Sequence, residues 1–286
     1  MTPMDKPVHR NYRHIEVRPI AGALGAEIRG VDIARPLEAE VVAEIHRAFL
    51  EHLVIFFRDQ KLTPQAQLAF SKQFGEPMEY PQLKGLPECP LIVPVIKLEH
   101  EAQNFGGLWH SDTTYLERPP MGSMLYAVET PPYGGDTLFA NQYLAYESLS
   151  EGLKQSLGSL SGVNTSTKAN ATKTREDRLR DDGLELKALS ARHPVVRTHP
   201  ETRRKALYVN VGHTAQFDGW SEEESRPLLD FLFEHQVKPE FTCRCRWEPG
   251  TLAFWDNRCT QHNPVNDYQG YRRVMHRVTL AGDTPN

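Results

Sequence analysis

The chain has 286 residues, a length typical of one large domain or two small ones. Hydrophobic residues make up 39% and charged residues 24%, which supplies a sizeable core and excludes disorder of the whole chain. The net charge of -4 lacks the basic excess of a nucleic-acid-binding protein. The N-terminus has no apolar signal segment, and no apolar run could cross a bilayer. We therefore expect a cytoplasmic protein that binds neither nucleic acid nor membrane.

The four cysteines do not form a disulfide framework or a zinc site. Cys243 and Cys245 alternate within a strand-like run, while Cys89 and Cys259 lie far away in the sequence. A structural zinc site would show CxxC pairs with a matching second half, and the sequence has none. We expect four reduced cysteines.

The N-terminal quarter mixes short strands with two helices. Residues 14–19 and 25–32 alternate in the manner of strands, and residues 53–57 form an apolar run typical of a buried strand. Between them, apolar residues recur at helical spacing from Pro36 to Phe49. Thr63 and Pro64 predict the cap and first turn of a helix that continues to Phe74 and ends at Gly75.

The remainder is mainly a series of short strand-like runs between Pro and Gly signals. One helix interrupts them: Ser221 and Glu224 predict a capping box at its start, and Pro227 lies early in it. Many strands with few helices predict a β-sandwich or jelly roll with helices outside it. The charged stretch 165–189 is interpreted as a solvated loop or a lid. The strand-like runs are 91–96, 122–128, 136–139, 193–198, 206–210, 241–247, 252–255 and 272–280.

A candidate metal site comes from two distant segments. His110 and Asp112 form a His-x-Asp pair that would face one side of a strand, although such a pair also arises by chance in a chain with twelve histidines. A third ligand from far downstream, His262, would complete a set of two histidines and one carboxylate. This set leaves one face of an octahedron open and suits non-haem Fe(II).

A second signal is a pair of arginines on one face of the last strand. Arg273, Met275 and Arg277 alternate with residues that include His276, which therefore is not a ligand candidate. Two guanidinium groups on an inward face need anions, and capture of a carboxylate is the obvious use. Thr137, which follows a two-glycine turn, could offer a hydroxyl to the same anion.

Two other functions use some of the same residues. A zinc hydrolase could activate a water with the three ligands, but it would have no use for two inward arginines. A non-catalytic anion-binding barrel would keep the arginines and tolerate the loss of Asp112. Both remain alternatives on the residues alone.

Together, the motifs WHSD (109–112), GGDT (134–137), WDNRCTQH (255–262) and RRVMHR (272–277) resemble the taurine dioxygenase/chlorophenoxyacetate dioxygenase family. The resemblance spans nearly the whole chain and implies one double-stranded β-helix domain over residues 1–286. It also implies an enzyme that uses Fe(II), 2-oxoglutarate and O2 to hydroxylate a small anionic compound, releasing succinate and CO2. The implied substrate classes are sulfonates, sulfate esters and aryloxyacids, and relatives form dimers or tetramers.

By the same resemblance, His110, Asp112 and His262 are the iron ligands. Arg273 and Thr137 bind the far carboxylate of 2-oxoglutarate. Arg277 lies near the anionic group of the substrate, and in some members of the family the matching arginine also helps to hold the cosubstrate.

The implied substrate pocket differs from that of the taurine enzymes. Tyr80 stands where those enzymes carry a histidine, and His213 where they carry a phenylalanine. Gly106 takes the place of a polar residue just before the WHSD motif. These differences favour a substrate other than taurine.

Overall fold

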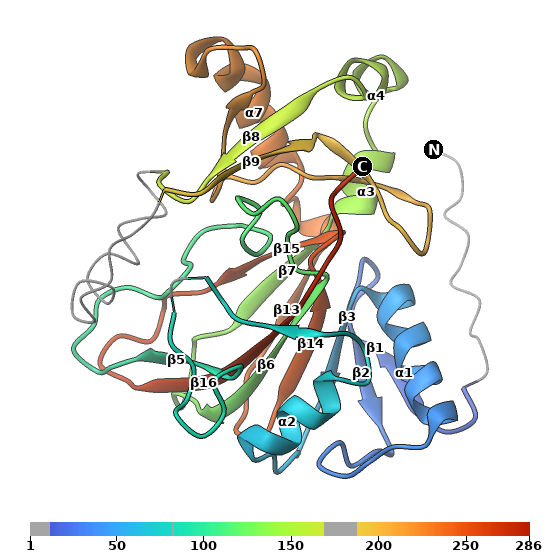
Figure 1. The fold of residues 1–286 in the computed structure, drawn as a ribbon, viewed down its shortest axis with the longest axis vertical. Helices are drawn as coiled ribbons and strands as arrows, with labels where there is room; N and C mark the ends of the chain where they lie inside the picture. Colours follow the sequence, from blue (N-terminus) through green and yellow to red (C-terminus); the bar gives the residue numbers. More distant parts are fainter. Residues whose placement is uncertain (1–11, 82, 169–187) are drawn as a thin grey trace.

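The computed structural model describes residues 12–81, 83–168 and 188–286. Most of the expected lid, residues 169–187, lies outside the described residues. Within them, two sheets form the body of the molecule and helices lie around it (Figure 1). This is the mainly β architecture with peripheral helices that the sequence predicts.

The larger sheet has eight strands and contains the first and the last strand of the chain. Its strand order is β1-β2-β3-β14-β6-β16-β4, with β5 also paired to β16, and all pairs except β2–β3 are antiparallel. Long-range pairings such as β3 with β14 bring the two halves of the chain together. The strands are β1 Glu16–Pro19, β2 Ala26–Arg29, β3 Val54–Phe57, β4 Pro77–Met78, β5 Val93–Lys97, β6 Gly122–Glu129, β14 Leu252–Asp256 and β16 Arg273–Leu280.

A three-stranded sheet of order β13-β7-β15 forms the second layer of the roll. Its antiparallel strands are β7 Thr137–Asn141, β13 Thr242–Cys245 and β15 Thr260–Pro264. Phe139 of β7 packs with Phe56 and Trp255 of the larger sheet, so one hydrophobic core lies between the layers.

The central strands are buried on both faces, which explains their continuous apolar runs. On β14, Leu252 and Phe254 pack on the helix-covered side, whereas Ala253 and Trp255 pack between the sheets. This alternation follows the two-residue period of a strand. Helices α1 (Ala39–His52) and α2 (Pro64–Ser71) cover the outer side, with Phe49 stacked on Phe254 at a centroid distance of 4.0 Å (Figure 1).

A smaller subassembly lies at the top of Figure 1 and packs around its own apolar cluster. It includes the sheet β12-β8-β9 and the hairpin β10-β11. Its elements are α3 Gln142–Glu147, α4 Glu151–Leu157, β8 Ser161–Thr165, β9 Ser190–Pro194, β10 Val196–Thr198, β11 Lys205–Leu207, β12 Thr214–Phe217, α7 Glu222–His235 and η1 Pro239–Phe241.

The predicted starts of α2 and α7 are confirmed, whereas the helix expected from Pro36 begins at Ala39, and one helix end is wrong. Thr63 accepts a hydrogen bond from the Ala66 amide, and Ser221 and Glu224 form the full capping box. Helix α2, however, ends at Ser71 with Lys72 as its cap, so Gly75 is not the end of that helix. The Lys72 amide already bonds to the carbonyl groups of the last turn, and no left-handed glycine is needed.

The four cysteines are buried and free, as expected from the sequence. Among the described residues, no helix is long and apolar enough to span a bilayer.

Candidate metal centre

The segment that carries His110 and Asp112 is not a strand, contrary to the prediction. His110 forms a single bridge to His262, and Asp112 lies in a turn where Thr113 has a φ of 42°. The backbones of His110 and His262 exchange two hydrogen bonds of 3.1 and 2.8 Å, and Ser111 Oγ donates to the Thr260 carbonyl at 2.7 Å. Strand β15 is therefore the template that holds the loop in place.

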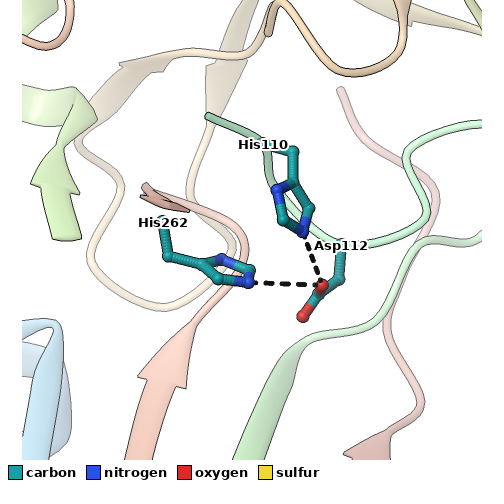
Figure 2. Close-up of side chains that lie close together, drawn as sticks. All are labelled: His110, Asp112 and His262. Atoms are coloured by element: carbon teal, nitrogen blue, oxygen red, sulfur yellow. Dashed lines mark ion pairs between the residues drawn. The ribbon is translucent and has the colours of Figure 1, made fainter. Parts of the chain in front are cut away.

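The three predicted ligands converge on one point (Figure 2). Asp112 Oδ1 lies 3.6 Å from His110 Nε2 and 3.7 Å from His262 Nε2. Ligand atoms that share an ion at about 2.1 Å lie roughly 3 to 4 Å apart, so this spacing fits a bound cation. The two imidazoles are 152 residues apart in the sequence, and the rolled sheet brings them together.

The surroundings of His110 and Asp112 leave one ligand atom of each residue available. The Leu108 carbonyl lies 2.6 Å from His110 Nδ1, which places the proton on Nδ1 and the lone pair on Nε2. Asp112 Oδ2 accepts from Ser123 Oγ at 2.8 Å and pairs with Arg277, whereas the buried Oδ1 has no hydrogen-bond partner within the described parts of the chain. An unsatisfied buried carboxylate oxygen beside two imidazoles fits a metal ion.

Electrostatics keep these groups in their ligand forms. Burial alone would raise the pKa of Asp112, but the positive charge of Arg277 outweighs burial and holds that pKa well below its usual value. Burial and the neighbouring His110 lower the pKa of His262 well below normal, so its ring is neutral. An anionic carboxylate and a neutral imidazole are the forms that bind metals.

A small cavity of about 40 Å³ opens beside these ligands, and Arg273 faces it. Arg273 is 6% exposed, and its Nε and Nη2 have no hydrogen-bond partner among the residues described. Burial lowers the pKa of its guanidinium group. Unsatisfied buried donors of this kind fit an incoming carboxylate. The cavity is lined by Val95, Phe105, Gly106, His110, Leu125, Thr137, Phe139, Trp247, Trp255, His262, Pro264, Arg273 and Arg277.

Thr137 lines the same cavity with a hydroxyl that can donate. Its Oγ1 accepts a hydrogen bond of 2.9 Å from Trp247 Nε1, which can only donate, so the hydroxyl proton remains for another acceptor. The preceding Gly134 has a φ of 72°, and a Cβ there would lie 2.6 Å from Asp267 Oδ1. The predicted two-glycine turn is therefore confirmed, and it sets the start of strand β7.

Arg277 lines the cavity too, but its main partner is a predicted metal ligand. Its guanidinium group pairs with Asp112 and lies 4.6 Å from the centroid of the Tyr80 ring. His276, on the opposite face of β16, does not line the cavity. The alternating faces predicted for this strand are therefore confirmed.

The three residues assigned to the substrate pocket are placed differently from one another. Gly106 lines the cavity, whereas Tyr80 and His213 are not among its lining residues. Tyr80 packs on Arg277, and the His213 ring lies 5.8 Å from the His110 ring. Gly106 has a φ of 71°, and a Cβ there would approach His110 Cε1 to 3.1 Å.

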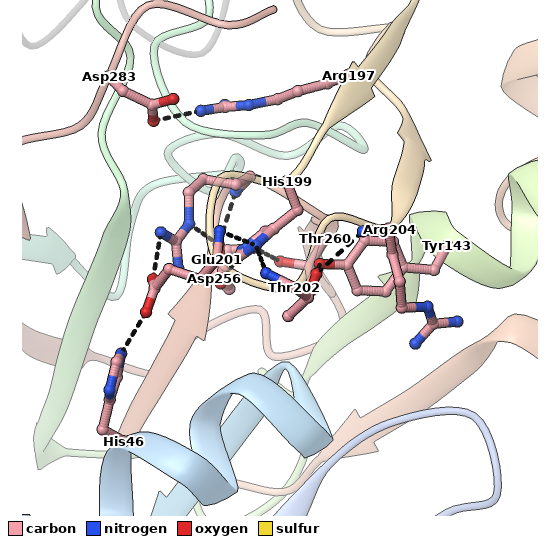
Figure 3. Close-up of polar contacts among 11 residues, drawn as sticks. His46, Tyr143, Arg197, His199, Glu201, Thr202, Arg204, Asp256, Thr260 and Asp283 are labelled. Carbon is pink, nitrogen blue, oxygen red and sulfur yellow. Dashed lines mark hydrogen bonds and ion pairs between the residues drawn. The ribbon is translucent and has the colours of Figure 1, made fainter. Parts of the chain in front are cut away.

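A second cluster of possible ligands consists of His199, Asp256 and Cys259, and it is a structural network. Figure 3 shows His199 and Asp256 with their polar neighbours. His199 Nδ1 accepts from two backbone amides, so Nε2 carries the proton and donates to Asp256 Oδ2 at 3.0 Å. Asp256 also accepts two side-chain hydrogen bonds from Arg258, of 2.8 and 2.7 Å. Burial raises the pKa of Cys259 well above normal, so its thiol is protonated. The network fixes the turn between β14 and β15 just before His262.

A jelly roll that joins two imidazoles and a carboxylate beside a buried, unsatisfied arginine defines the class of Fe(II)- and 2-oxoglutarate-dependent oxygenases. Residues 16–279 match the taurine catabolism dioxygenase TauD, TfdA family, and the chain belongs to that family. It is a 2-oxoglutarate-dependent dioxygenase whose reaction uses Fe(II) and O2.

Individual relatives match over almost their full length. The chain is 37% identical over 279 residues to the alpha-ketoglutarate-dependent sulfate ester dioxygenase of Pseudomonas putida, which covers 95% of this chain and 91% of that protein. It is 30% identical to the alpha-ketoglutarate-dependent 2,4-dichlorophenoxyacetate dioxygenase of Cupriavidus pinatubonensis, with 94% and 98% covered. The crystal structure of a taurine dioxygenase from Burkholderia xenovorans superposes with a TM-score of 0.82 at 38% identity, with 96% and 91% covered.

Proposed function

We propose that His110, Asp112 and His262 hold Fe(II), and that Arg273 and Thr137 bind the far carboxylate of 2-oxoglutarate. The observation that carries this assignment is the unsatisfied Oδ1 of Asp112, which lies between two imidazole Nε2 atoms. The unsatisfied donors of Arg273 face the same cavity, so the cation site and the anion site are adjacent.

Bound Fe(II), 2-oxoglutarate and O2 together supply the oxidising power that converts a C–H bond to C–OH, while 2-oxoglutarate becomes succinate and CO2. The protein binds, orients and excludes water. Arg273 and Thr137 would fix the far end of 2-oxoglutarate, and the buried position of Arg273 strengthens its charge-assisted hydrogen bonds.

For the substrate, we propose an alkyl sulfate ester. The sulfate ester dioxygenase relative is more similar to this chain than the aryloxyacetate enzyme, at 37% against 30% identity. Val95, Leu125 and Pro264 give the cavity an apolar wall suited to an alkyl chain. Arg277, which also lines the cavity, would attract the sulfate group, and Tyr80 and His213 would act on specificity through Arg277 and His110.

The proposed reaction balances. One oxygen atom of O2 enters succinate, and the other converts R–CH2–O–SO3⁻ to R–CH(OH)–O–SO3⁻. The C–O bond of this product then breaks to give the aldehyde R–CHO, sulfate and a proton. Sulfate release coupled to succinate formation is therefore the expected signature.

The test is a substrate panel of alkyl sulfates, alkyl sulfonates and aryloxyacetates, with Fe(II), ascorbate and 2-oxoglutarate. We expect the highest substrate-dependent succinate formation with an alkyl sulfate. Preference for a sulfonate or an aryloxyacid would refute the substrate class but leave the reaction intact. Full activity of His110→Ala, or activity without iron, would refute the metal assignment.

Three wider predictions from the sequence accompany this proposal. We propose that the enzyme is cytoplasmic. We also propose that it assembles as a dimer or tetramer, and light scattering coupled to size-exclusion chromatography would test the oligomeric state. We also propose that residues 1–286 form one domain in which 165–189 acts as a lid. Proteolysis with and without 2-oxoglutarate would test the lid, because closure over the site would slow cleavage there.

A further inference from the structure

The outer oxygen of the predicted ligand Asp112 lies at the end of a chain of buried hydrogen bonds. Ser123 Oγ donates to Asp112 Oδ2 at 2.8 Å, and Asn257 Nδ2 donates to Ser123 Oγ at 3.1 Å. Trp255 Nε1 donates to Asn257 Oδ1 at 3.0 Å. Ser123, Asp112 and Asn257 are fully buried, and Trp255 is 2% exposed, so water does not compete for these bonds.

The direction of every bond in this chain is fixed by groups that can only donate. The indole nitrogen of Trp255 and the backbone amide of Asp112 both point at Asn257 Oδ1, so the amide nitrogen of Asn257 must face Ser123. The Ser123 hydroxyl therefore accepts from Asn257, and it also accepts from Arg277 Nη2 at 3.2 Å. Its two acceptor positions are filled, and its single proton must go to Asp112.

The chain of bonds also connects the two halves of the metal site. The Trp255 ring lies 4.8 Å from the ring of His262. The series of hydrogen bonds therefore begins at a residue that packs on the predicted ligand His262 and ends at the predicted ligand Asp112. Asn257 is held in position because it follows Asp256, which Arg258 and His199 fix in the network of Figure 3.

We propose that Ser123 and Asn257 are positioning residues that make Asp112 bind the metal through Oδ1 alone. The inference rests on the proposed ligand set. With Oδ2 held by Ser123 and Arg277, the carboxylate cannot rotate to present both oxygens to the ion. A carboxylate that binds through one oxygen would use, with two imidazoles, one octahedral position fewer than a chelating carboxylate. Three positions would then remain for 2-oxoglutarate and O2.

The experiment measures Mn(II) binding to the metal-free full-length protein by titration calorimetry and by the EPR spectrum of the bound ion. Mn(II) is chosen because it is stable in air. The variants are Ser123→Ala, Asn257→Ala and the double variant, with circular dichroism as a check of folding. Ser225→Ala is the matched control, since Ser225 is a fully buried serine that also donates one hydrogen bond and accepts another. It lies in helix α7 and does not line the cavity. Asp112→Ala reports on the site itself.

We expect each single variant to raise the Kd for Mn(II) about tenfold or more, the usual effect of removing a partner of a metal ligand. Because both residues act through one chain of bonds, the double variant should lose no more than the weaker-binding single variant. The EPR spectrum should change in the same variants, whereas Ser225→Ala should match the wild type in both measurements.

Three outcomes would overturn the proposal in distinguishable ways. If Ser123→Ala and folded Asn257→Ala bind Mn(II) with wild-type affinity while Asp112→Ala loses binding, the positioning role is refuted. The proposed ligand set is then retained. Equal weakening in Ser225→Ala, or strictly additive losses in the double variant, would assign the effect to general destabilisation. Wild-type affinity in Asp112→Ala would refute the ligand set and with it the proposed function.

Discussion

Replacing Arg273 by methionine should weaken 2-oxoglutarate binding and stabilise the free protein. Each hydrogen bond to a charged group contributes about 1.5 to 3 kcal/mol, and Nε and Nη2 of Arg273 both lack a partner within the described structure. Loss of the pair should cost about 3 kcal/mol, or roughly a hundredfold in Kd. In the free protein the same charge is buried 5.5 Å from the Trp247 ring, and among the described residues it forms no ion pair with a carboxylate. An apolar side chain of similar length should therefore be tolerated better.

Thermal unfolding in the presence of Mn(II), with and without 2-oxoglutarate, separates the two effects. At a 2-oxoglutarate concentration a hundred times the wild-type Kd, the ligand should stabilise the wild type by about 2.7 kcal/mol. At that concentration Arg273→Met should gain only about 0.4 kcal/mol, because its Kd would then equal the ligand concentration. Its Tm without ligand should lie above that of the wild type.

Arg273→Lys is the control, because it keeps the charge but loses the planar pair of donors. We expect it to bind 2-oxoglutarate more weakly than the wild type and more tightly than Arg273→Met. If Arg273→Met binds 2-oxoglutarate within threefold of the wild type, the far carboxylate does not contact Arg273. If Arg273→Met without 2-oxoglutarate is less stable than the wild type without 2-oxoglutarate, the buried charge of Arg273 does not destabilise the free protein as we infer.

Three further outcomes are expected. Gly106→Ala should weaken Mn(II) binding, because a Cβ there would press on His110 and because alanine would have to adopt the left-handed backbone of Gly106. A calorimetric affinity equal to that of the wild type would contradict this. Asp256→Asn should cost about 3 to 5 kcal/mol at pH 7 by leaving Arg258 partly unpaired. Burial raises the pKa of Asp256, but Arg258 and His199 outweigh burial and hold that pKa below its usual value. The stability that the wild type gains over Asp256→Asn is therefore lost only below about pH 4, where the carboxyl of the unfolded chain becomes protonated. Urea unfolding at a series of pH values measures this difference. The four buried thiols should react with a disulfide reagent only after unfolding, because burial raises the pKa of Cys245, for example, to about 12.

Local patterns predicted the elements of the fold well, and the failures share one cause. The caps at Thr63 and Ser221 and the alternation on β16 depend on neighbours a few residues apart, which the sequence displays directly. Gly75 and the supposed strand at His110 were wrong because their conformations depend on partners elsewhere. The loop at His110 is shaped by its two backbone hydrogen bonds to His262, 152 residues away in the sequence.

The sequence by itself determined the chemistry that is present: two histidines, a carboxylate and two arginines, in motifs that identify the family. Only the tertiary structure decided which atoms are available. Ser123 lies in no motif that we singled out, yet it holds one oxygen of Asp112 and leaves the other unsatisfied. Arg277 has the residue type of an anion receptor, but its first partner is that same carboxylate. The physical reason is that hydrogen bonds and ion pairs are saturable, so the role of a polar side chain depends on which neighbours the fold brings within about 3 Å of it.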